Sequence, residues 1–139
     1  MPDVPPFSPT IMLLTTSRIW DAELNEGLKP LGLTTRKYGL LGHIRRTPDI
    51  SFSELARRSR ITVQSAHTAV AALKDKGLVD DATAHAGSAS TLRVTADGEE
   101  LLTRAGEVVA ELDAQFTARH PELTDALKAN MTRLLAQAD

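Results

Sequence analysis

The 139-residue sequence contains no cysteine, and this absence excludes several kinds of chemistry at once. Without a thiol the chain can form no disulfide, offer no thiolate to a metal ion and use no cysteine as a nucleophile or redox sensor. Any signal that the protein senses must therefore act through other chemistry.

Long apolar runs are missing as well. No segment approaches the roughly 20 apolar residues that a membrane-spanning helix needs. The first ten residues, MPDVPPFSPT, have neither the basic start nor the apolar stretch of a signal peptide. We therefore expect a cytoplasmic protein with no membrane partner, built as one ordinary domain or as a small domain with an added interaction surface.

Charge is distributed unevenly along the chain, although the net charge is only -2. The segment 31–95 contains ten Lys or Arg against five Asp or Glu, whereas the rest of the chain contains six against thirteen. Such asymmetry is expected when one part of a protein faces a polyanion, because phosphate neutralisation supplies much of the affinity for nucleic acid. A solvated basic face without a partner is the alternative.

The segment 51–95 has the pattern of a helix-turn-helix followed by a β-wing. Ser51 with Glu54 three residues later is typical of a capping box, which begins a short helix, SFSELARRS. Thr62 should cap the next helix, and two short strand signals then enclose a loop, residues 80–90, that is rich in Ala, Gly and Ser. This arrangement usually places one helix in the major groove of DNA.

The second helix of this pair has two different faces, and it should end at Gly77, a typical C-cap residue. Four apolar residues recur at helical spacing, and we expect the stripe that they form to be buried. They are Val63, Ala66, Val70 and Leu73. The opposite face is small and polar, which permits close approach to a flat surface. It consists of Gln64, Ser65, Thr68, Ala71 and Ala72.

Further helices are expected on both sides of this segment. Ser8 and Pro9 are typical of a helix start, and Thr34 and Thr95 are natural N-caps of two more helices. Pro121 should open the last helix. The first helix and the last two have more apolar surface than a winged helix of this size needs for its own core. Association with a second copy is the economical way to bury it, which predicts a homodimer.

These patterns predict a mainly α fold, a winged helix-turn-helix with a small two- or three-stranded β-wing and additional dimerisation helices. We divide the chain into an N-terminal dimerisation helix (1–30), a winged-helix DNA-binding domain (31–95) and C-terminal dimerisation helices (96–139).

Four runs of the sequence match the motifs of a known family. They are LGLTTRKYGLLGHI, SFSELARRSRIT, ALKDKGLV and LRVTADGEELL. Together they closely resemble the MarR family of bacterial winged-helix regulators, over residues 31–102 by motif and over the rest by helix order. The resemblance implies a homodimer that reads a pseudo-palindromic operator in double-stranded DNA. It also implies a repressor that works on the bacterial nucleoid and releases DNA when a small molecule, often aromatic, binds between its two lobes.

The resemblance places the recognition helix on residues 62–74, beginning at Thr62. Base-facing roles would fall on Gln64, Ser65 and Thr68, with His67 as a further candidate at the border between the two faces. A glutamine side chain can pair with adenine, and hydroxyls can contact a base or a phosphate. The candidates for phosphate contact, each of which could instead be an ordinary surface charge, are Arg36, Lys37, Arg57, Arg58 and Lys74.

The sequence departs from the family at the expected DNA contacts. Members typically have an arginine where this chain has Thr68, and a basic pair where it has Asp80 and Asp81. Their DRR-type wing tip is replaced here by AHAGSAS, in which only His85 could imitate a basic contact. An alternative function is therefore a winged-helix dimer that has lost tight DNA binding and acts through a protein partner or as a ligand carrier.

An effector pocket between the lobes is predicted from the same resemblance. Its lining would be Trp20, Tyr38, Leu41, His43 and Ile44. His43 or Arg45 could receive a carboxylate from a small aromatic or apolar effector, although each residue could equally belong to the core or the surface.

Catalytic and metal chemistry find little support in the sequence. His43, His67 and His120, like the wing histidine, lie in no motif with a nucleophile or paired carboxylates. Glu23 and Glu26 have helical spacing but no histidine nearby in sequence. We expect no enzyme activity, no metal site and no cofactor.

Overall fold

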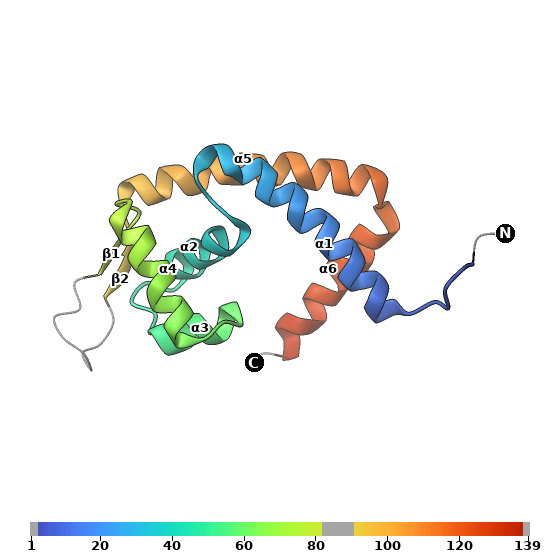
Figure 1. Cartoon of the computed structure of the whole chain (residues 1–139), viewed down its shortest axis with the longest axis horizontal. Coiled ribbons are helices and arrows are strands. Elements are labelled where there is room, and N and C mark those ends of the chain that lie inside the picture. Colours follow the sequence, from blue (N-terminus) through green and yellow to red (C-terminus); the bar gives the residue numbers. More distant parts are fainter. Residues whose placement is uncertain (1–2, 82–90, 138–139) are drawn as a thin grey trace.

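The chain folds into helices gathered at the two ends of one long helix (Figure 1). This computed structural model describes residues 3–81 and 91–137. Its elements in order are α1 (Pro9–Leu28), the 3-10 turn η1 (Lys29–Leu31), α2 (Thr35–Arg46), α3 (Phe52–Ser59), α4 (Val63–Asp75), β1 (Val79–Asp81), β2 (Leu92–Val94), α5 (Ala96–Arg119) and α6 (Pro121–Gln137). The helices α2 to α4 and both strands lie at one end of α5, α6 lies at the other, and α1 packs along α5. The predicted fold class is confirmed.

Five of the predicted helix starts have the expected N-cap, and the last helix begins at Pro121 as predicted. The hydroxyls of Ser8, Thr34, Ser51, Thr62 and Thr95 each accept a hydrogen bond from the backbone N–H three residues later. The capping box is only half formed, because the Glu54 carboxylate accepts hydrogen bonds from Arg57 and Arg58 instead of returning to the cap residue. Gly77 follows α4 with φ +73°, as expected for a C-cap glycine.

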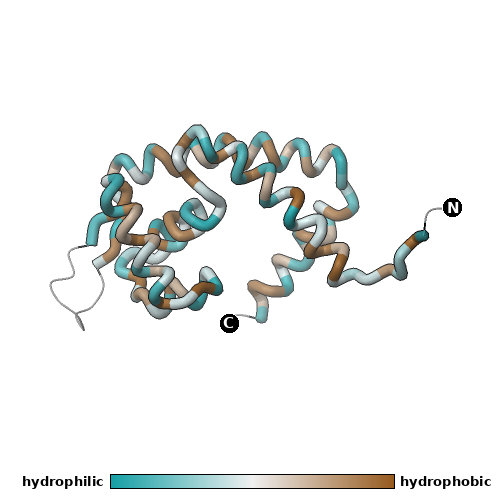
Figure 2. The backbone as a smooth tube through the Cα atoms, viewed as in Figure 1, coloured by the Kyte–Doolittle hydropathy of each residue, from teal (hydrophilic) through white to brown (hydrophobic). Residues whose placement is uncertain are grey.

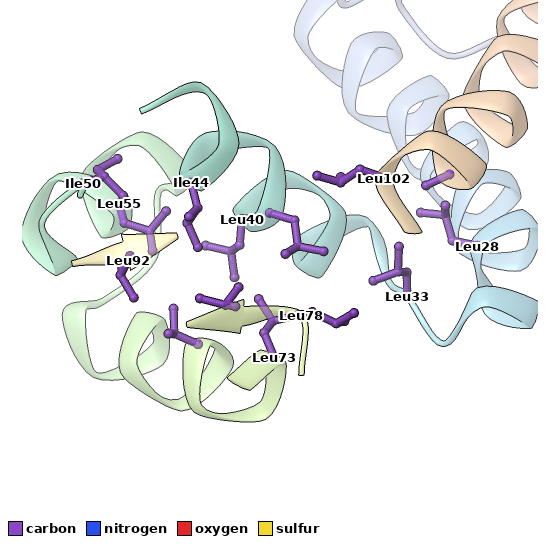
Figure 3. Close-up of a cluster of buried hydrophobic side chains, with 14 residues drawn as sticks. Leu28, Leu33, Leu40, Ile44, Ile50, Leu55, Leu73, Leu78, Leu92 and Leu102 are labelled. Carbon is purple, nitrogen blue, oxygen red and sulfur yellow. The ribbon is translucent and has the colours of Figure 1, made fainter. Parts of the chain in front are cut away.

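A single hydrophobic core joins the winged helix to the start of α5 (Figure 3). Its members are Leu28, Leu33, Leu40, Leu41, Ile44, Ile50, Leu55, Val70, Leu73, Leu78, Val79, Leu92, Leu102 and Ala105. Leu28 at the end of α1 and Leu102 in α5 belong to the same cluster as the helix-turn-helix residues. The core therefore extends across both boundaries of the winged-helix segment.

The wing begins as a two-stranded antiparallel sheet. Val79 pairs with Val94, and Asp80 pairs with Arg93. A third strand is represented only by one backbone hydrogen bond, from the Asp49 N–H to the Leu92 carbonyl oxygen at 3.0 Å. Because α5 starts directly after β2, its Gly98 lies close to Leu78, the residue before β1. A Cβ on Gly98 would come within 2.3 Å of the Leu78 carbonyl oxygen.

The other end of the molecule exposes its apolar side chains. Figure 2 shows hydrophobic residues along α1 and α6. Many of their large apolar side chains are exposed to solvent. The exposed large apolar residues of the two helices are Ile11, Met12, Leu13, Leu14, Ile19, Leu123, Leu127, Met131, Leu134 and Leu135. This is the surface for which the sequence predicts a second copy.

Candidate nucleic-acid interface

Helix α4 presents its small, polar face to the outside. Ala66, Val70 and Leu73 are buried, as predicted, whereas Gln64 and Thr68 on the opposite face are exposed. The prediction for Val63 is wrong, since 44% of this residue is exposed. It is the first residue of the helix, one turn before the residues that reach the core.

Five of the predicted DNA-contact residues of α2 and α4 line one shallow pocket of about 320 Å³, while His67 and Lys74 of α4 lie outside it. Its lining consists of Arg36, Lys37, Gln64, Ser65, Thr68, Ala69 and Ala72. The pocket thus combines two cations from α2 with three polar side chains from α4. We call this surface the α2–α4 pocket.

Internal hydrogen bonds decide what each polar group of α4 can offer to a ligand. The Thr62 hydroxyl donates to the Ser65 oxygen at 2.8 Å, so the Ser65 proton remains available. The Thr68 hydroxyl donates to the Gln64 carbonyl oxygen at 3.1 Å, which leaves Thr68 as an acceptor. The Gln64 side-chain amide has no partner in the described residues and can both donate and accept.

His67 packs against α3, so its ring is not free to extend towards a DNA base. Its ring stacks on Phe52 with centroids 3.9 Å apart and an interplanar angle of 15°. The pair joins the two helices of the helix-turn-helix, and it was missed in the sequence because the two residues belong to different elements. A contact from His67 to a base would have to use the edge of this stacked ring.

Two of the predicted phosphate contacts share one carboxylate. Arg57 and Arg58 both donate hydrogen bonds to Glu54, and Arg58 also donates to the Thr47 hydroxyl at 2.9 Å. These bonds stabilise the ionised carboxyl group and lower the pKa of Glu54 to about 2. The three side chains together carry one net positive charge at neutral pH.

The wing provides little free positive charge in the part of the chain that the structure describes. Arg93 forms a two-pronged ion pair with Asp49, at 3.0 and 2.8 Å, which sequence reasoning missed. Lys74 donates to the Asp81 carbonyl oxygen at 3.4 Å, while Asp80 is exposed on β1. His85, the basic contact predicted for the wing tip, lies outside the described residues.

The five predicted effector residues do not line one cleft. Leu41 and Ile44 are fully buried in the core, and Tyr38 packs against the same cluster. Trp20 lies near the far end of α5, where its ring meets Phe116 edge-on at 4.9 Å and lines an apolar cavity of about 400 Å³ between α1, α5 and α6. The effector pocket therefore stays a prediction, since in this single chain Trp20 and His43 line two different cavities.

His43 lines a different cavity, and its charge state disagrees with the role predicted for it. Burial, with the nearby Arg46 and Arg58 guanidinium groups, lowers the pKa of His43 below its ordinary value of 6.5. The ring is therefore neutral at pH 7 and cannot attract a carboxylate by charge. Arg45, the other candidate, lies 3.9 Å from the Glu99 carboxylate, so it already has an anionic partner.

The described residues contain neither a cluster of metal ligands nor a membrane-spanning helix. Among residues 3–81 and 91–137, no group of three or more His, Asp or Glu is placed to hold a metal ion. No helix in these ranges is both long and apolar enough to cross a membrane.

Comparisons with known proteins agree on one family. The model of the MarR family matches residues 31–87. The chain is 33% identical over 109 residues to the HTH-type transcriptional repressor Rv2887 of Mycobacterium tuberculosis, with 78% of each protein covered.

Two solved structures of the same mycobacterial MarR-family protein, Rv2887, also match. The complex with salicylic acid has 30% identity and a TM-score of 0.68, covering 99% of this chain and 98% of the other. The complex with DNA has 28% identity and a TM-score of 0.73, covering 96% and 98%.

Proposed function

Because this chain belongs to the MarR family, we propose that it is a dimeric, DNA-binding transcriptional repressor whose DNA affinity is modulated by a small molecule. The observation that carries this proposal is the α2–α4 pocket, where two cations flank the polar face of an exposed recognition helix. The mycobacterial relative named a transcriptional repressor, and its complexes with DNA and with salicylic acid, support both parts of the proposal.

The recognition helix reads bases with the three polar groups that point out of the fold. Gln64 has an amide that can pair with adenine N6 and N7, Ser65 offers a proton, and Thr68 offers an acceptor. Arg36 and Lys37 hold the helix in register by contacting phosphates beside the groove. Arg57, Arg58 and Lys74 are further phosphate contacts in this proposal.

Two copies are needed to read a pseudo-palindromic operator. The exposed apolar faces of α1 and α6 supply a surface for the second copy, since contiguous apolar patches of this kind usually mark an interface. A two-fold dimer would then present two α4 helices to successive major grooves, about 34 Å apart along the DNA.

The protein acts by binding alone in this proposal, without enzymatic activity. Its site of action is the bacterial cytoplasm, on the nucleoid, because a repressor must reach chromosomal DNA. The mycobacterial repressor to which it is similar supports this placement.

The test is a mobility-shift titration with the DNA that flanks the protein's own gene, at about 50 mM salt, where phosphate contacts are least screened. We expect a discrete protein–DNA complex. Gln64→Ala should weaken binding to the operator sequence by roughly 1–3 kcal/mol, whereas Arg36→Gln should weaken binding to all DNA sequences alike. Ser53→Ala, an exposed change on α3 outside the pocket, is the control. Absence of any complex, with or without salicylate, would refute the proposal.

A second candidate function is supported by the wing. Asp80 is exposed and Arg93 is neutralised by Asp49, so the described part of the wing repels phosphate more than it attracts it. On this reading the dimer has lost tight DNA binding and acts through a protein partner or as a ligand carrier. The Asp80→Arg variant separates the two functions: it strengthens an existing complex under the first and creates one from nothing under the second.

A further inference from the structure

Arg60 has a backbone conformation that normally belongs to glycine. Its φ is +53°, in the left-handed region that L side chains rarely adopt. The residue ends α3 in a Schellman motif: its own N–H donates to the Arg57 carbonyl oxygen at 3.3 Å, and the Ile61 N–H donates to the Ala56 carbonyl oxygen at 3.0 Å. Glycine is the usual residue at this position, because its missing Cβ removes the steric cost. The arginine therefore introduces a strain that the fold does not require.

The same chain has glycine at two other helix ends of this kind. Gly32, after η1, and Gly77, after α4, have φ values of +71° and +73°. Each is followed by a leucine whose N–H donates to a leucine carbonyl oxygen five residues earlier, at 3.3 and 3.0 Å. Asp49 is the other non-glycine residue at positive φ in the described residues, and its carboxylate is paired with Arg93. Arg60 differs from all three, since it is neither a glycine nor a residue whose side chain has an ionic partner.

The Arg60 side chain forms no polar contact within the described part of the fold. It is exposed, and its guanidinium has no hydrogen-bond or ion-pair partner among residues 3–81 and 91–137. Non-glycine residues held in the left-handed region cluster at functional sites. The strain at Arg60 therefore indicates a contact outside the chain, and a free guanidinium selects an anionic partner.

Arg60 lies beside the surface that is proposed to read DNA. Together with Thr35, Arg36 and Ser59 it lines a cavity of about 240 Å³ between α2 and the end of α3. Arg36 also lines the α2–α4 pocket, so the two arginines border adjoining parts of one surface. Arg60 precedes Thr62, the N-cap of α4, by two residues. In helix-turn-helix proteins the start of the second helix contacts bases while the first helix crosses the DNA backbone, so the turn between them lies next to phosphates.

We propose that Arg60 is a DNA contact, whose guanidinium binds a backbone phosphate beside the phosphate that Arg36 contacts. The guanidinium presents paired N–H donors that match two phosphate oxygens. A phosphate contact carries no sequence information, so Arg60 raises the affinity for every DNA sequence alike. This inference rests on the proposed function.

Arg60 supplies positive charge that the wing does not. The described part of the wing contains one basic residue, Arg93, and its guanidinium is paired with Asp49. Asp80 on β1 is exposed and adds negative charge. A free cation at the turn between α3 and α4 therefore shifts DNA binding towards the helix-turn-helix and away from the wing.

The test is a fluorescence anisotropy titration of the full chain with two duplexes, the DNA that flanks its own gene and an unrelated sequence, between about 50 and 200 mM salt. Arg60→Gln keeps the Cβ but removes the charge. It should weaken binding to both duplexes at least about tenfold at the lowest salt, and it should reduce the slope of log K against log salt by about one per subunit. Arg60→Lys retains the charge and should retain the slope. Lys128→Gln, which removes an exposed cation of α6, is the matched control and should change neither quantity.

Thermal unfolding tests the backbone strain separately from DNA binding. Arg60→Gly should melt about 2–5 °C above Arg60→Gln, because glycine adopts the left-handed conformation without a steric cost. The two variants should bind DNA equally weakly, since both lack the charge.

Several outcomes would overturn the proposal. They are an Arg60→Gln variant that binds both duplexes as the parent does, an Arg60→Lys variant that loses as much affinity as Arg60→Gln, a loss confined to one duplex, and an Arg60→Gly variant that melts below Arg60→Gln. In each of these cases the parent still forms its DNA complex, so the proposed function stands while the Arg60 contact fails. A parent that forms no DNA complex refutes the proposed function and this contact with it.

Discussion

The two ends of the molecule differ in how far they bury their apolar side chains. At the winged-helix end, α2, α3, α4 and the strands bury a continuous cluster of leucine, isoleucine and valine, and Val63 is the exception among the large apolar side chains of these elements. At the other end, α1 and α6 leave many such side chains exposed. The winged-helix end therefore buries its core within one chain, whereas the exposed apolar face of α1 and α6 is the surface that we propose a second copy covers.

The largest effect is expected inside the winged-helix core. Leu73→Ala should lower the free energy of unfolding by about 2–5 kcal/mol, because it leaves a cavity at a fully buried position. The matched control on the same helix is Val63→Ala, which should cost well under 1 kcal/mol because Val63 is 44% exposed. Urea unfolding followed by circular dichroism measures both, and equal losses would contradict the division of α4 into a buried and an open face.

Substitutions on the exposed apolar face of α6 should weaken dimer association more than they destabilise the fold. Leu134→Asp should weaken the dimer by about 3 kcal/mol, more than a hundredfold in Kd, since a two-fold interface loses one buried leucine from each copy. Lys128→Gln, on the same helix, is the control. Sedimentation equilibrium measures the association, and a dimer unaffected by Leu134→Asp would show that this part of α6 is not the contact surface.

A smaller effect is expected where the two ends are joined. Gly98→Ala should destabilise the fold by about 1–3 kcal/mol, because the new Cβ would collide with the Leu78 carbonyl oxygen and the Val94 side chain. Gly106 in the same helix has nothing within 4 Å of an added Cβ, so Gly106→Ala should stabilise the helix by about 0.5–1 kcal/mol. The melting temperatures of the two variants should shift in opposite directions, and a shift in the same direction would contradict the close approach of α5 to Leu78 and Val94.

The smallest effect concerns the surface of the helix-turn-helix. Hydrogen bonds from Arg57 and Arg58 lower the pKa of Glu54 from 4.5 to about 2, so the unfolded chain binds this proton at a higher pH than the folded chain does. The stabilisation is therefore complete above pH 4.5 and is lost as the pH falls towards 2. Unfolding titrations between these limits should show a shallower acid-induced decline for Glu54→Gln than for the parent. Identical slopes would contradict this ion network.

Local features of the fold were predictable from the sequence, while the site was predictable only in part. The caps at Ser8, Thr34 and Thr62 follow from interactions between residues three apart, which a sequence pattern displays directly. The polar face of α4 follows in the same way from helical spacing. The separation of Trp20 from His43 into two cavities was not predictable, because it depends on how α1 and α5 cross the winged helix.

By itself, the sequence determined the family, the order of the helices, their starting residues and which face of α4 is exposed to solvent. These properties depend on neighbouring residues and on a period of 3.6 residues per turn. Only the tertiary structure decided that Asp49 pairs with Arg93, 44 positions away in sequence, that Phe52 stacks on His67, and that Thr35 and Ser59 line one cavity. Such pairings depend on the packing of separate elements around a shared core, and side-chain spacing along one element contains no information about them.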